Sequence, residues 1–468
     1  MSNCECTRRS FVRSLAAGSA LLPGLIARLL ADDARTGDDP LAPKQPHFAP
    51  RAKRVIMVYL SGGFSHIDSF DPKPRLIADH GKQIVADHPE IKNRPGYEKI
   101  FLKRPQWAFA PHGRSGIEVS SLFPHIAGCV DDLALIRSMH TSHSNHFNAT
   151  LGIHTGSFTV ARPSMGAWVS YGLGTENRNL PSFMVLAPHT PYAGMQVWAS
   201  DFLPAEHQGT WVVPGTEPIA NMKRRAASRE LQDLELAALR DRNAEHLAAR
   251  AGDPILTARI RSFETAAGMQ LEAPEAFDLT KENDETLDLY GLARGQATGF
   301  GWQCLVARRL SERGVRFIEL IDSGSSNNWD SHSDMLDHAK LAKNVDRPIA
   351  ALLRDLKRRG MLEDTLVVFT TEFGRTPFNS SADHKGREHH NWAFSSWLAG
   401  AGVRPGIAYG ETDEYGMKVV KDGVHVHDFH ATILHLMGFD HTKLTFRHSG
   451  RDYRLTDVRG EVVGPLLA

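Results

Sequence analysis

The sequence predicts an α/β fold, an α/β sandwich in which helices cover a mostly parallel central sheet. Three observations predict it. Short apolar runs, typical of strands buried on both faces, recur at residues 55–60, 133–137, 183–187, 315–321, 365–371 and 394–399. Helical patterns lie between several of the runs, as at residues 344–359, and this alternation is typical of parallel sheets. Polar clusters follow the runs.

The N-terminus has the pattern of an export signal. Arg8 and Arg9 directly precede an apolar stretch at residues 15–30, which predicts a twin-arginine (Tat) signal peptide over residues 1–32. The alternative is an amphipathic N-terminal helix. A membrane span needs about 20 apolar residues, so we expect no permanent membrane anchor. We expect the Tat export machinery to deliver the protein to the periplasm or the extracellular space. Residues 33–52, polar and proline-containing, are interpreted as a linker.

The composition excludes two broad classes of protein. The 54 basic and 54 acidic residues balance, so we expect no nucleic-acid partner held by a general basic field. Only Cys129 and Cys304 follow the predicted signal peptide, which permits one disulfide but no disulfide-rich scaffold. Histidine is abundant, with 24 residues, and neutral imidazole is the commonest metal ligand in proteins.

Residues 53–468 are long enough for one large α/β domain with insertions. Residues 221–272 differ in composition, because they are rich in Arg, Glu, Ala and Leu and contain few turn signals. We expect a helical insertion there, whose charges form a solvated face.

Four polar clusters each follow an apolar run, at residues 61–71, 140–146, 322–332 and 372–375. Ligands of open α/β sheets bind at the carboxyl ends of the strands. We therefore expect these clusters to converge on one edge of the sheet.

The clearest metal-binding candidates are Asp330 and His332, because an Asp and a His two positions apart in a loop can bind one divalent cation. The alternative is an Asx-turn with a surface histidine. His389 and His390 precede the strand predicted at residues 394–399. Only one of two adjacent side chains usually faces a site.

Other candidates lie at the remaining strand ends. Glu372 falls where a strand ends, and Arg375 could hold an anionic group with its planar donor fork or pair with Glu372. His146 belongs to residues 139–147, which lead into a helix predicted to close at Thr155 and Gly156, and helix N-termini attract anions. A fourth group of polar side chains follows Gly62 and Gly63: Ser65, His66 and Asp68.

Together these motifs resemble the DUF1501 family, exported proteins of the alkaline-phosphatase/sulfatase-like superfamily that are abundant in planctomycetes. The resemblance extends from about residue 53 to the C-terminus and rests on four segments: residues 62–74, 329–332, 364–377 and 387–390. It implies an alkaline-phosphatase-like sandwich. It also implies metal ligands at Asp330, His332 and either His389 or His390, and it aligns Glu372 with the Asp of an Asp-His-Gly motif.

The chain also departs from the superfamily pattern. Ser61 stands where active members have a metal-binding Asp, and no cysteine has the Cys-x-Pro-x-Arg context of a sulfatase nucleophile. The resemblance places Asn145 or His146 at the nucleophile position. A formylglycine sulfatase is therefore not expected, and a second metal site has lost a ligand.

These residues favour an exported metal-dependent hydrolase of phosphate or sulfate esters, acting on an anionic small molecule or a polysaccharide ester. A divalent cation (Zn, Ca or Mg) would stabilise developing negative charge. Glu372, Asp68 or His66 would complete its ligands, and His146 or Ser65 would be the nucleophile, or His146 the base. The alternatives are a non-catalytic metal- or glycan-binding surface protein on the same scaffold, and a transferase or phosphomutase.

Overall fold

The computed structural model describes residues 40–85, 91, 97–250 and 253–468. The chain divides into two compact units, residues 1–42 and 43–468, and all the described helices and strands lie in the second. The predicted signal peptide, residues 1–32, lies outside the described residues, as do residues 33–39 of the predicted linker.

A nine-stranded sheet forms the centre of the second unit, with most of its strands in the order β15-β6-β14-β10-β1-β9-β7-β8 and β18 beside β6. Every pairing is parallel except those of β14, which runs antiparallel to β10 and β6. The prediction of a mostly parallel sheet is confirmed. The strands are β1 (Arg54–Tyr59), β6 (Leu133–His140), β7 (Phe183–Leu186), β8 (Thr210–Val212), β9 (Phe317–Ile321), β10 (Thr365–Thr370), β14 (Phe394–Ala399), β15 (Ile407–Tyr409) and β18 (Val424–His425).

The central strands are apolar throughout because both faces of the sheet are covered. Alternate residues of β1 belong to different cores, with Ile56 and Val58 on one face and Val55 and Met57 on the other. β1 pairs with β10 and β9, so residues 55–60 and 365–371 lie in one sheet, as predicted.

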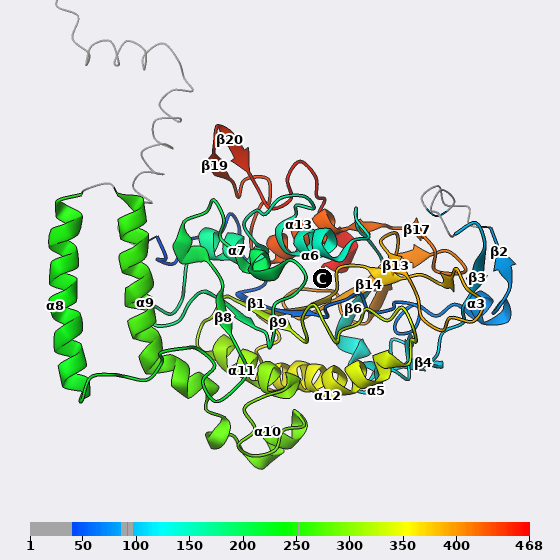
Figure 1. The fold of residues 1–468 in the computed structure, drawn as a ribbon, viewed down its shortest axis with the longest axis horizontal. Coiled ribbons are helices and arrows are strands. Elements are labelled where there is room, and N and C mark those ends of the chain that lie inside the picture. Colours follow the sequence, from blue (N-terminus) through cyan, green and yellow to red (C-terminus); the bar gives the residue numbers. More distant parts are fainter. Residues whose placement is uncertain (1–39, 86–90, 92–96, 251–252) are drawn as a thin grey trace, which may run out of the picture. The chain divides into compact units, whose positions relative to one another are not determined.

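Helices form a layer on each face of the sheet (Figure 1). One layer contains α5 (Pro124–Ala127), α11 (Phe300–Glu312) and α12 (Asp337–Arg358). The other contains α6 (His146–Thr155), α7 (Met165–Leu173) and α13 (Val426–Leu436). The predicted helix over residues 344–359 is the second half of α12. The sandwich architecture is confirmed.

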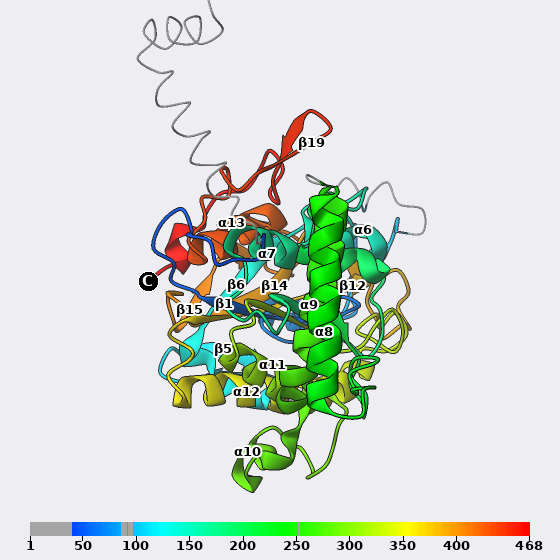
Figure 2. The same cartoon turned by 90° about the vertical axis from the view of Figure 1, so that its left-hand side faces the viewer.

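The helical insertion consists of α8 (Arg229–Ala248) and α9 (Pro254–Phe277), which lie side by side at one end of the sheet (Figures 1 and 2). No residue of α8 is buried, as expected for a solvated insertion. The helices begin later than the predicted range of 221–272, because Ser228 and Asp253 cap their N-termini with side-chain hydrogen bonds. α9 ends at Phe277, five residues beyond the predicted range.

Shorter elements surround the sandwich. The remaining helices are α3 (Pro74–Ala78) and α10 (Asp284–Leu289), with 3-10 turns η1 (Val130–Asp132), η2 (Gly194–Trp198), η3 (Ala205–His207), η4 (Leu279–Lys281) and η5 (Gly464–Leu466). Small sheets are formed by β2 (Gln83–Ile84), β3 (Ile100–Leu102) and β12 (Phe378–Asn379); β4 (Phe109–His112) and β5 (Ile117–Ser120); β11 (Gly374–Arg375) and β13 (His389–His390); β16 (Glu411–Thr412) and β17 (Val419–Lys421); and β19 (Phe446–His448) and β20 (Arg451–Tyr453). Within the described ranges, no helix is both long and apolar enough to cross a bilayer.

Candidate metal centre

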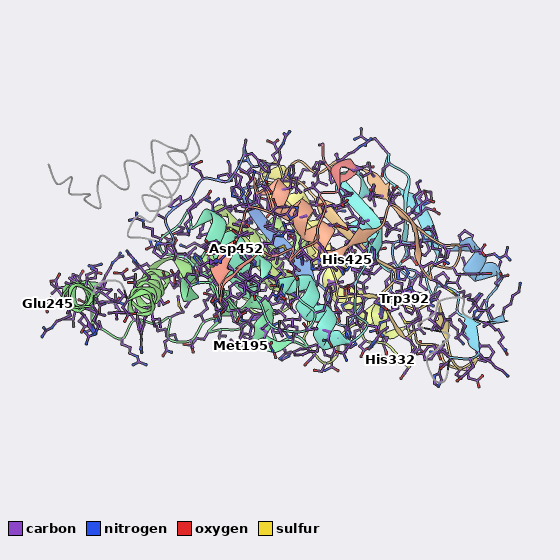
Figure 3. The ribbon with its side chains drawn as sticks, turned by 90° about the horizontal axis from the view of Figure 1, so that it is seen from above. Met195, Glu245, His332, Trp392, His425 and Asp452 are labelled. Atoms are coloured by element: carbon purple, nitrogen blue, oxygen red, sulfur yellow. The ribbon has the colours of Figure 1, made fainter. Side chains whose placement is uncertain are left out.

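The direction of the strands brings four chain segments to one edge of the sheet. β6, β9 and β10 run parallel and end at this edge, so the residues that follow them, His146, Asp330 and Glu372, meet there. β14 runs the opposite way and begins at the same edge, so the residues of β13 that precede it reach the same place. His332 lies at the margin of the molecule, far from Glu245 of α8 (Figure 3).

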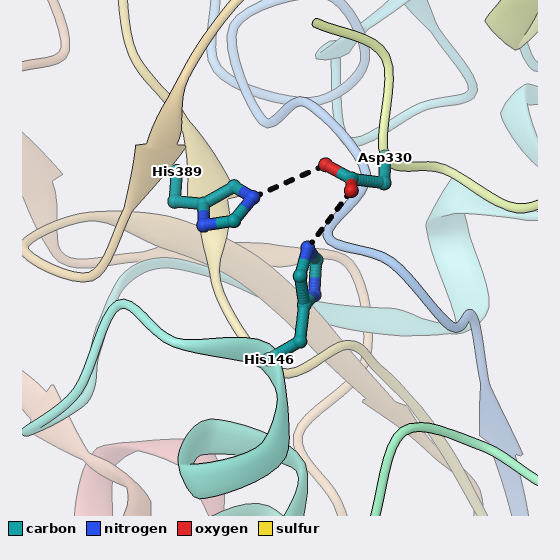
Figure 4. A group of neighbouring side chains, drawn as sticks. All are labelled: His146, Asp330 and His389. Atoms are coloured by element: carbon teal, nitrogen blue, oxygen red, sulfur yellow. Dashed lines mark hydrogen bonds and ion pairs between the residues drawn. The ribbon is translucent and has the colours of Figure 1, made fainter. Parts of the chain in front are cut away.

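The structure places His146 and His389 around the carboxylate of Asp330 (Figure 4). Nε2 of His146 lies 3.2 Å from Oδ2 of Asp330, and Nε2 of His389 lies 3.1 Å from Oδ1. One ligand atom from each of the three residues lies within 4.8 Å of the other two. This spacing suits three ligands of one metal ion.

His332 contacts this group on the side of the group that faces solvent. Its Nε2 lies 2.8 Å from Oδ1 of Asp330 and 3.0 Å from Nε2 of His389, while its Nδ1 lies 3.1 Å from Glu388. The structure thus brings together Asp330, His332 and His389, as predicted for shared ligands. We name His146, Asp330, His332 and His389 the open cluster.

The imidazoles of His146, which is buried, and His389, which is half-buried, are oriented by their Nδ1 atoms. Nδ1 of His146 donates to Oε1 of Glu372 at 2.8 Å, and Nδ1 of His389 donates to the carbonyl of Ser144 at 2.8 Å. In a neutral ring this leaves an Nε2 lone pair directed toward Asp330. Nε2 of His146 is also buried, and among the described residues it has the contact with Asp330 but no hydrogen bond.

Glu372 acts on the cluster through His146. Its carboxylate is fully buried and accepts from the Tyr59 hydroxyl at 2.8 Å, from the Gly62 amide at 2.8 Å and from the Thr371 hydroxyl at 2.9 Å. The predicted metal ligand Glu372 therefore orients a ligand, as outer carboxylates do in many metal sites.

Arg375 holds Asp330 and does not pair with Glu372. Its guanidinium is fully buried, donates to Oδ1 of Asp330 at 2.6 Å, and also donates to the carbonyls of Gly62 and Gly63. The predicted role of binding an anionic substrate does not fit this arrangement, because the donors are already used inside the protein.

The side chains of the open cluster shift one another's pKa values. Burial opposes ionisation of Asp330, but contacts with His146, His332 and His389 and the charge of Arg375 lower the pKa of Asp330 far below its usual range. Hydrogen bonds to Asp330 and Glu388 raise the pKa of His332 to about 9. Burial lowers the pKa of His389. The cluster thus concentrates anionic charge on Asp330 among nitrogen donors.

Four other predicted residues lie in a separate network. Asp68 is fully buried and accepts from Nε of Arg387 at 2.7 Å and from the Ser65 hydroxyl at 2.5 Å. His66 and His390 stack with ring centroids 5.6 Å apart, and Nε2 of each lies within 3.2 Å of the Gly416 carbonyl. Their contacts place Ser65, His66, Asp68 and His390 away from the open cluster. We name His66, Asp68, Arg387 and His390 the closed cluster.

Tyr192 was not among the predicted residues. Its ring stacks on His146 at 4.0 Å between centroids, and its hydroxyl lies 3.5 Å from Oδ2 of Asp330 and 3.1 Å from Nδ2 of Asn328. Tyr192 lies in the loop that follows β7, another strand of the parallel sheet. The same strand-end rule that selected Asp330 could have selected this loop.

A cavity of about 1400 Å³ adjoins the open cluster, and both Asp330 and Tyr192 line it. The lining also includes the N-terminal half of α12 and the loop at residues 322–328. The carboxylate that the imidazoles surround is therefore accessible to a small molecule in this cavity.

A family model matches almost the whole described domain, in agreement with the sequence motifs. The model of DUF1501, described as a protein of unknown function, matches residues 52–467. The chain belongs to the DUF1501 family. None of the curated proteins matches the DUF1501 chain in sequence.

Several solved structures of enzymes are similar to this DUF1501 protein, but their sequences have low identity to it. The lipoteichoic acid synthase LtaP from Listeria monocytogenes is 11% identical, with 87% of this chain and 76% of that chain covered and a TM-score of 0.36. The alkaline phosphatase from the Antarctic bacterium TAB5 is 12% identical (85% and 100% covered, TM-score 0.32). The PsFucS1 sulfatase from Pseudoalteromonas sp. is 12% identical (83% and 68% covered, TM-score 0.34). Such distant likenesses assign no activity.

The open cluster of this DUF1501 protein fits a divalent cation. Two Nε2 lone pairs facing a carboxylate repel it unless a proton or a cation lies between them. Two imidazoles and one carboxylate also match the ligand sets of catalytic zinc sites, which keep one position open. Ca²⁺ and Mg²⁺ prefer ligand sets made of oxygen atoms. Two of the three ligands here are nitrogen atoms.

Proposed function

We propose that the protein is an exported metal-dependent hydrolase of phosphate or sulfate esters. The observation that carries this proposal is the pair of imidazoles whose Nδ1 atoms are fixed by Glu372 and Ser144, so that both Nε2 atoms face Asp330 beside a cavity. Metal-binding histidines are oriented in this way by outer hydrogen bonds.

His146, Asp330 and His389 hold the cation in this proposal, and zinc is the ion that suits them best. A divalent cation there supplies Lewis acidity toward an ester oxygen. Arg375 fixes Asp330 from the buried side at 2.6 Å, and Glu372 fixes His146. The ligands are thus pre-positioned before a substrate arrives.

Water is the nucleophile that the arrangement favours. The predicted nucleophile Ser65 is buried and donates to Asp68. His146 has its Nδ1 on Glu372 and its Nε2 at the metal position, so neither nitrogen is left for attack. In the proposed reaction, a water oxygen bonds to phosphorus or sulfur, the bond to the alcohol oxygen breaks, and the alcohol leaves with a proton.

A non-catalytic metal- or glycan-binding surface protein is the second candidate. Ser61 favours it, because this residue follows β1 without a carboxylate and its hydroxyl donates to the Gly324 carbonyl at 2.9 Å. Binding of a metal or a glycan without turnover would identify this candidate.

One experiment separates the two candidates. The purified protein is analysed for bound metal and assayed on aryl phosphates and aryl sulfates, before and after a chelator and after zinc is returned. The hydrolase proposal expects about one ion per chain and turnover that a chelator abolishes and zinc restores. Metal without turnover on either ester class favours the binding protein, and no bound metal at any zinc concentration overturns the hydrolase proposal.

We propose that export uses the Tat route, since the paired arginines are the part of the signal that this translocase reads. The double variant Arg8→Lys/Arg9→Lys is expected to stay in the cytoplasm when cell fractions are blotted. Unchanged export of the double variant would indicate the general secretory route.

A further inference from the structure

A single row of cations lines the cavity beside the open cluster. Lys340, Lys343 and Arg347 all face the cavity from α12. Their spacing of three and four residues places them on one face of the helix. Lys340 and Lys343 are exposed and make no ion pair within the described ranges, whereas Arg347 pairs with the exposed Asp288 at 3.0 Å.

The carboxylates of α12 do not cancel this row. Asp346 lines the cavity but accepts the backbone N–H groups of His125 and Ile126, each at 2.8 Å, and is buried. Asp337 is exposed and lies in the first turn of α12, where the helix dipole favours an acidic side chain. Lys340, Lys343 and Arg347 outnumber the two carboxylates, so the α12 lining keeps one net positive charge.

The cavity is larger than one small ester requires. Pockets for small molecules have volumes of about 300–1,000 Å³, and this cavity has about 1400 Å³. It is lined by both Asp337 and Arg347, which span about 15 Å along the helix at 1.5 Å per residue. A ligand at Asp330 can therefore continue past the cation row.

The rest of the lining suits a hydroxyl-rich ligand. Ser325, Ser326 and Asn327 are exposed on the loop that follows β9, and Gln296 lies on the lining as well. Hydroxyl and amide groups both donate and accept hydrogen bonds, as sugar hydroxyls do. The balanced net charge argues against a nucleic acid, which is bound by a strongly basic surface.

We infer that the cavity binds an extended anionic glycan, whose ester group lies at the open cluster and whose next charged groups lie on Lys340 and Lys343. The inference rests on the proposed function and chooses the polysaccharide ester over the small molecule as substrate. The cation row supplies affinity and register, and the open cluster supplies the chemistry.

The test measures binding of labelled dextran sulfate oligomers by fluorescence anisotropy, at low and at physiological salt. Comparison ligands of matched length are unsulfated dextran and oligothymidylate. The variant is Lys340→Ala/Lys343→Ala, and its control is Lys281→Ala/Lys357→Ala, which removes two lysines that do not line the cavity. Wild-type turnover of a small aryl ester is measured separately.

We expect dextran sulfate to bind the wild-type protein and its control about equally and the Lys340→Ala/Lys343→Ala variant about tenfold more weakly, the loss of one charged hydrogen bond or more. Physiological salt should make the difference in affinity between the wild type and this variant smaller, because salt screens exposed charges. Equal binding by both double variants overturns the inference even if aryl esters are hydrolysed. Oligothymidylate that binds as tightly as dextran sulfate shows recognition of charge alone and overturns the glycan assignment. Lysine-dependent glycan binding without any turnover supports the inference while the hydrolase proposal fails.

Discussion

The open and closed clusters lie at the same edge of the sheet and use the same residue types, yet they differ in access. Each contains a carboxylate held by a buried arginine, Asp330 by Arg375 and Asp68 by Arg387. The side chain of Asp330 is 24% exposed and lines the cavity, whereas that of Asp68 has no exposed area.

The adjacent residues of β13 divide between the two clusters. His389 points to Asp330, and His390 stacks on His66, because successive side chains of a strand point to opposite faces. Residue type therefore does not decide which group binds a ligand. The contacts decide: in the closed cluster Arg387 neutralises Asp68, and Nε2 of each histidine lies at the Gly416 carbonyl, whereas the open cluster directs lone pairs at one point next to a cavity.

The largest effect is expected from Arg387→Ala, because this change leaves the carboxylate of Asp68 buried without its cation. Breaking one partner of a buried ion pair costs about 3–5 kcal/mol in the free energy of unfolding. Urea denaturation measures the loss. The exposed pair of Lys421 and Glu411 is the control, and Lys421→Ala should leave stability unchanged. A similar stability for Arg387→Ala and wild type would contradict a structural role for the closed cluster.

The pH dependence of stability tests the same pair. Burial opposes ionisation of Asp68, but Arg387 and the Ser65 hydroxyl lower its pKa below the ordinary value of 3.8. A carboxyl whose pKa is lower in the folded state stabilises the fold above its unfolded pKa and loses this effect as the pH falls. The stability difference between wild type and Asp68→Asn should therefore narrow below about pH 4.

The next effect separates the two histidines of β13. His389→Ala removes a proposed ligand and should weaken zinc binding by more than about 100-fold, beyond the range seen for outer-sphere changes. His390→Ala, one residue away, should leave zinc affinity unchanged. Competition with a chromophoric chelator measures both. Equal losses in the two variants would mean that the clusters are not functionally distinct.

The fold and most of the open cluster could be predicted because both follow from strand ends. Continuous apolar runs identify strands buried on both faces, and the residues after β9 and β10 must then lie at one edge. The reversed direction of β14 has no local signal in the sequence. β14 is as apolar as β10 and β6, the two neighbouring strands that run antiparallel to it. That direction places β13, and hence His389, beside Asp330.

The partners of charged side chains could not be predicted from spacing. Arg375 lies three residues from Glu372 but donates to Asp330, because the turn after β10 brings its guanidinium within 2.6 Å of Oδ1 of Asp330. Asp68 looked like a ligand because it follows β1, yet Arg387, distant in sequence, neutralises it inside the protein. Tertiary packing selects such pairs, and a single sequence does not contain that information.

A smaller effect is expected from Glu372→Gln, which keeps the shape of the side chain but removes its charge. Glu372 fixes the ring of His146, and loss of such an outer partner lowers metal affinity about 10–100-fold. The comparison variant is Glu388→Gln, whose partner His332 is outside the three-residue group, and its loss should be smaller. If Glu372→Gln binds zinc as wild type does, the charge of Glu372 is not needed, and an amide oxygen is enough to orient His146.

The smallest effect is expected from Tyr192→Phe, which removes the hydroxyl near Asp330 and keeps the ring stacked on His146. The contact of 3.5 Å to Asp330 is long, so zinc affinity should fall by about threefold or less, the lower end for a neutral hydrogen bond. Tyr192→Ala also removes the ring that covers His146 and should cause the larger loss. The same competition assay measures both variants. A loss in Tyr192→Phe as large as in Glu372→Gln would place the Tyr192 hydroxyl among the groups that hold the cation, and would extend the open cluster to the loop after β7.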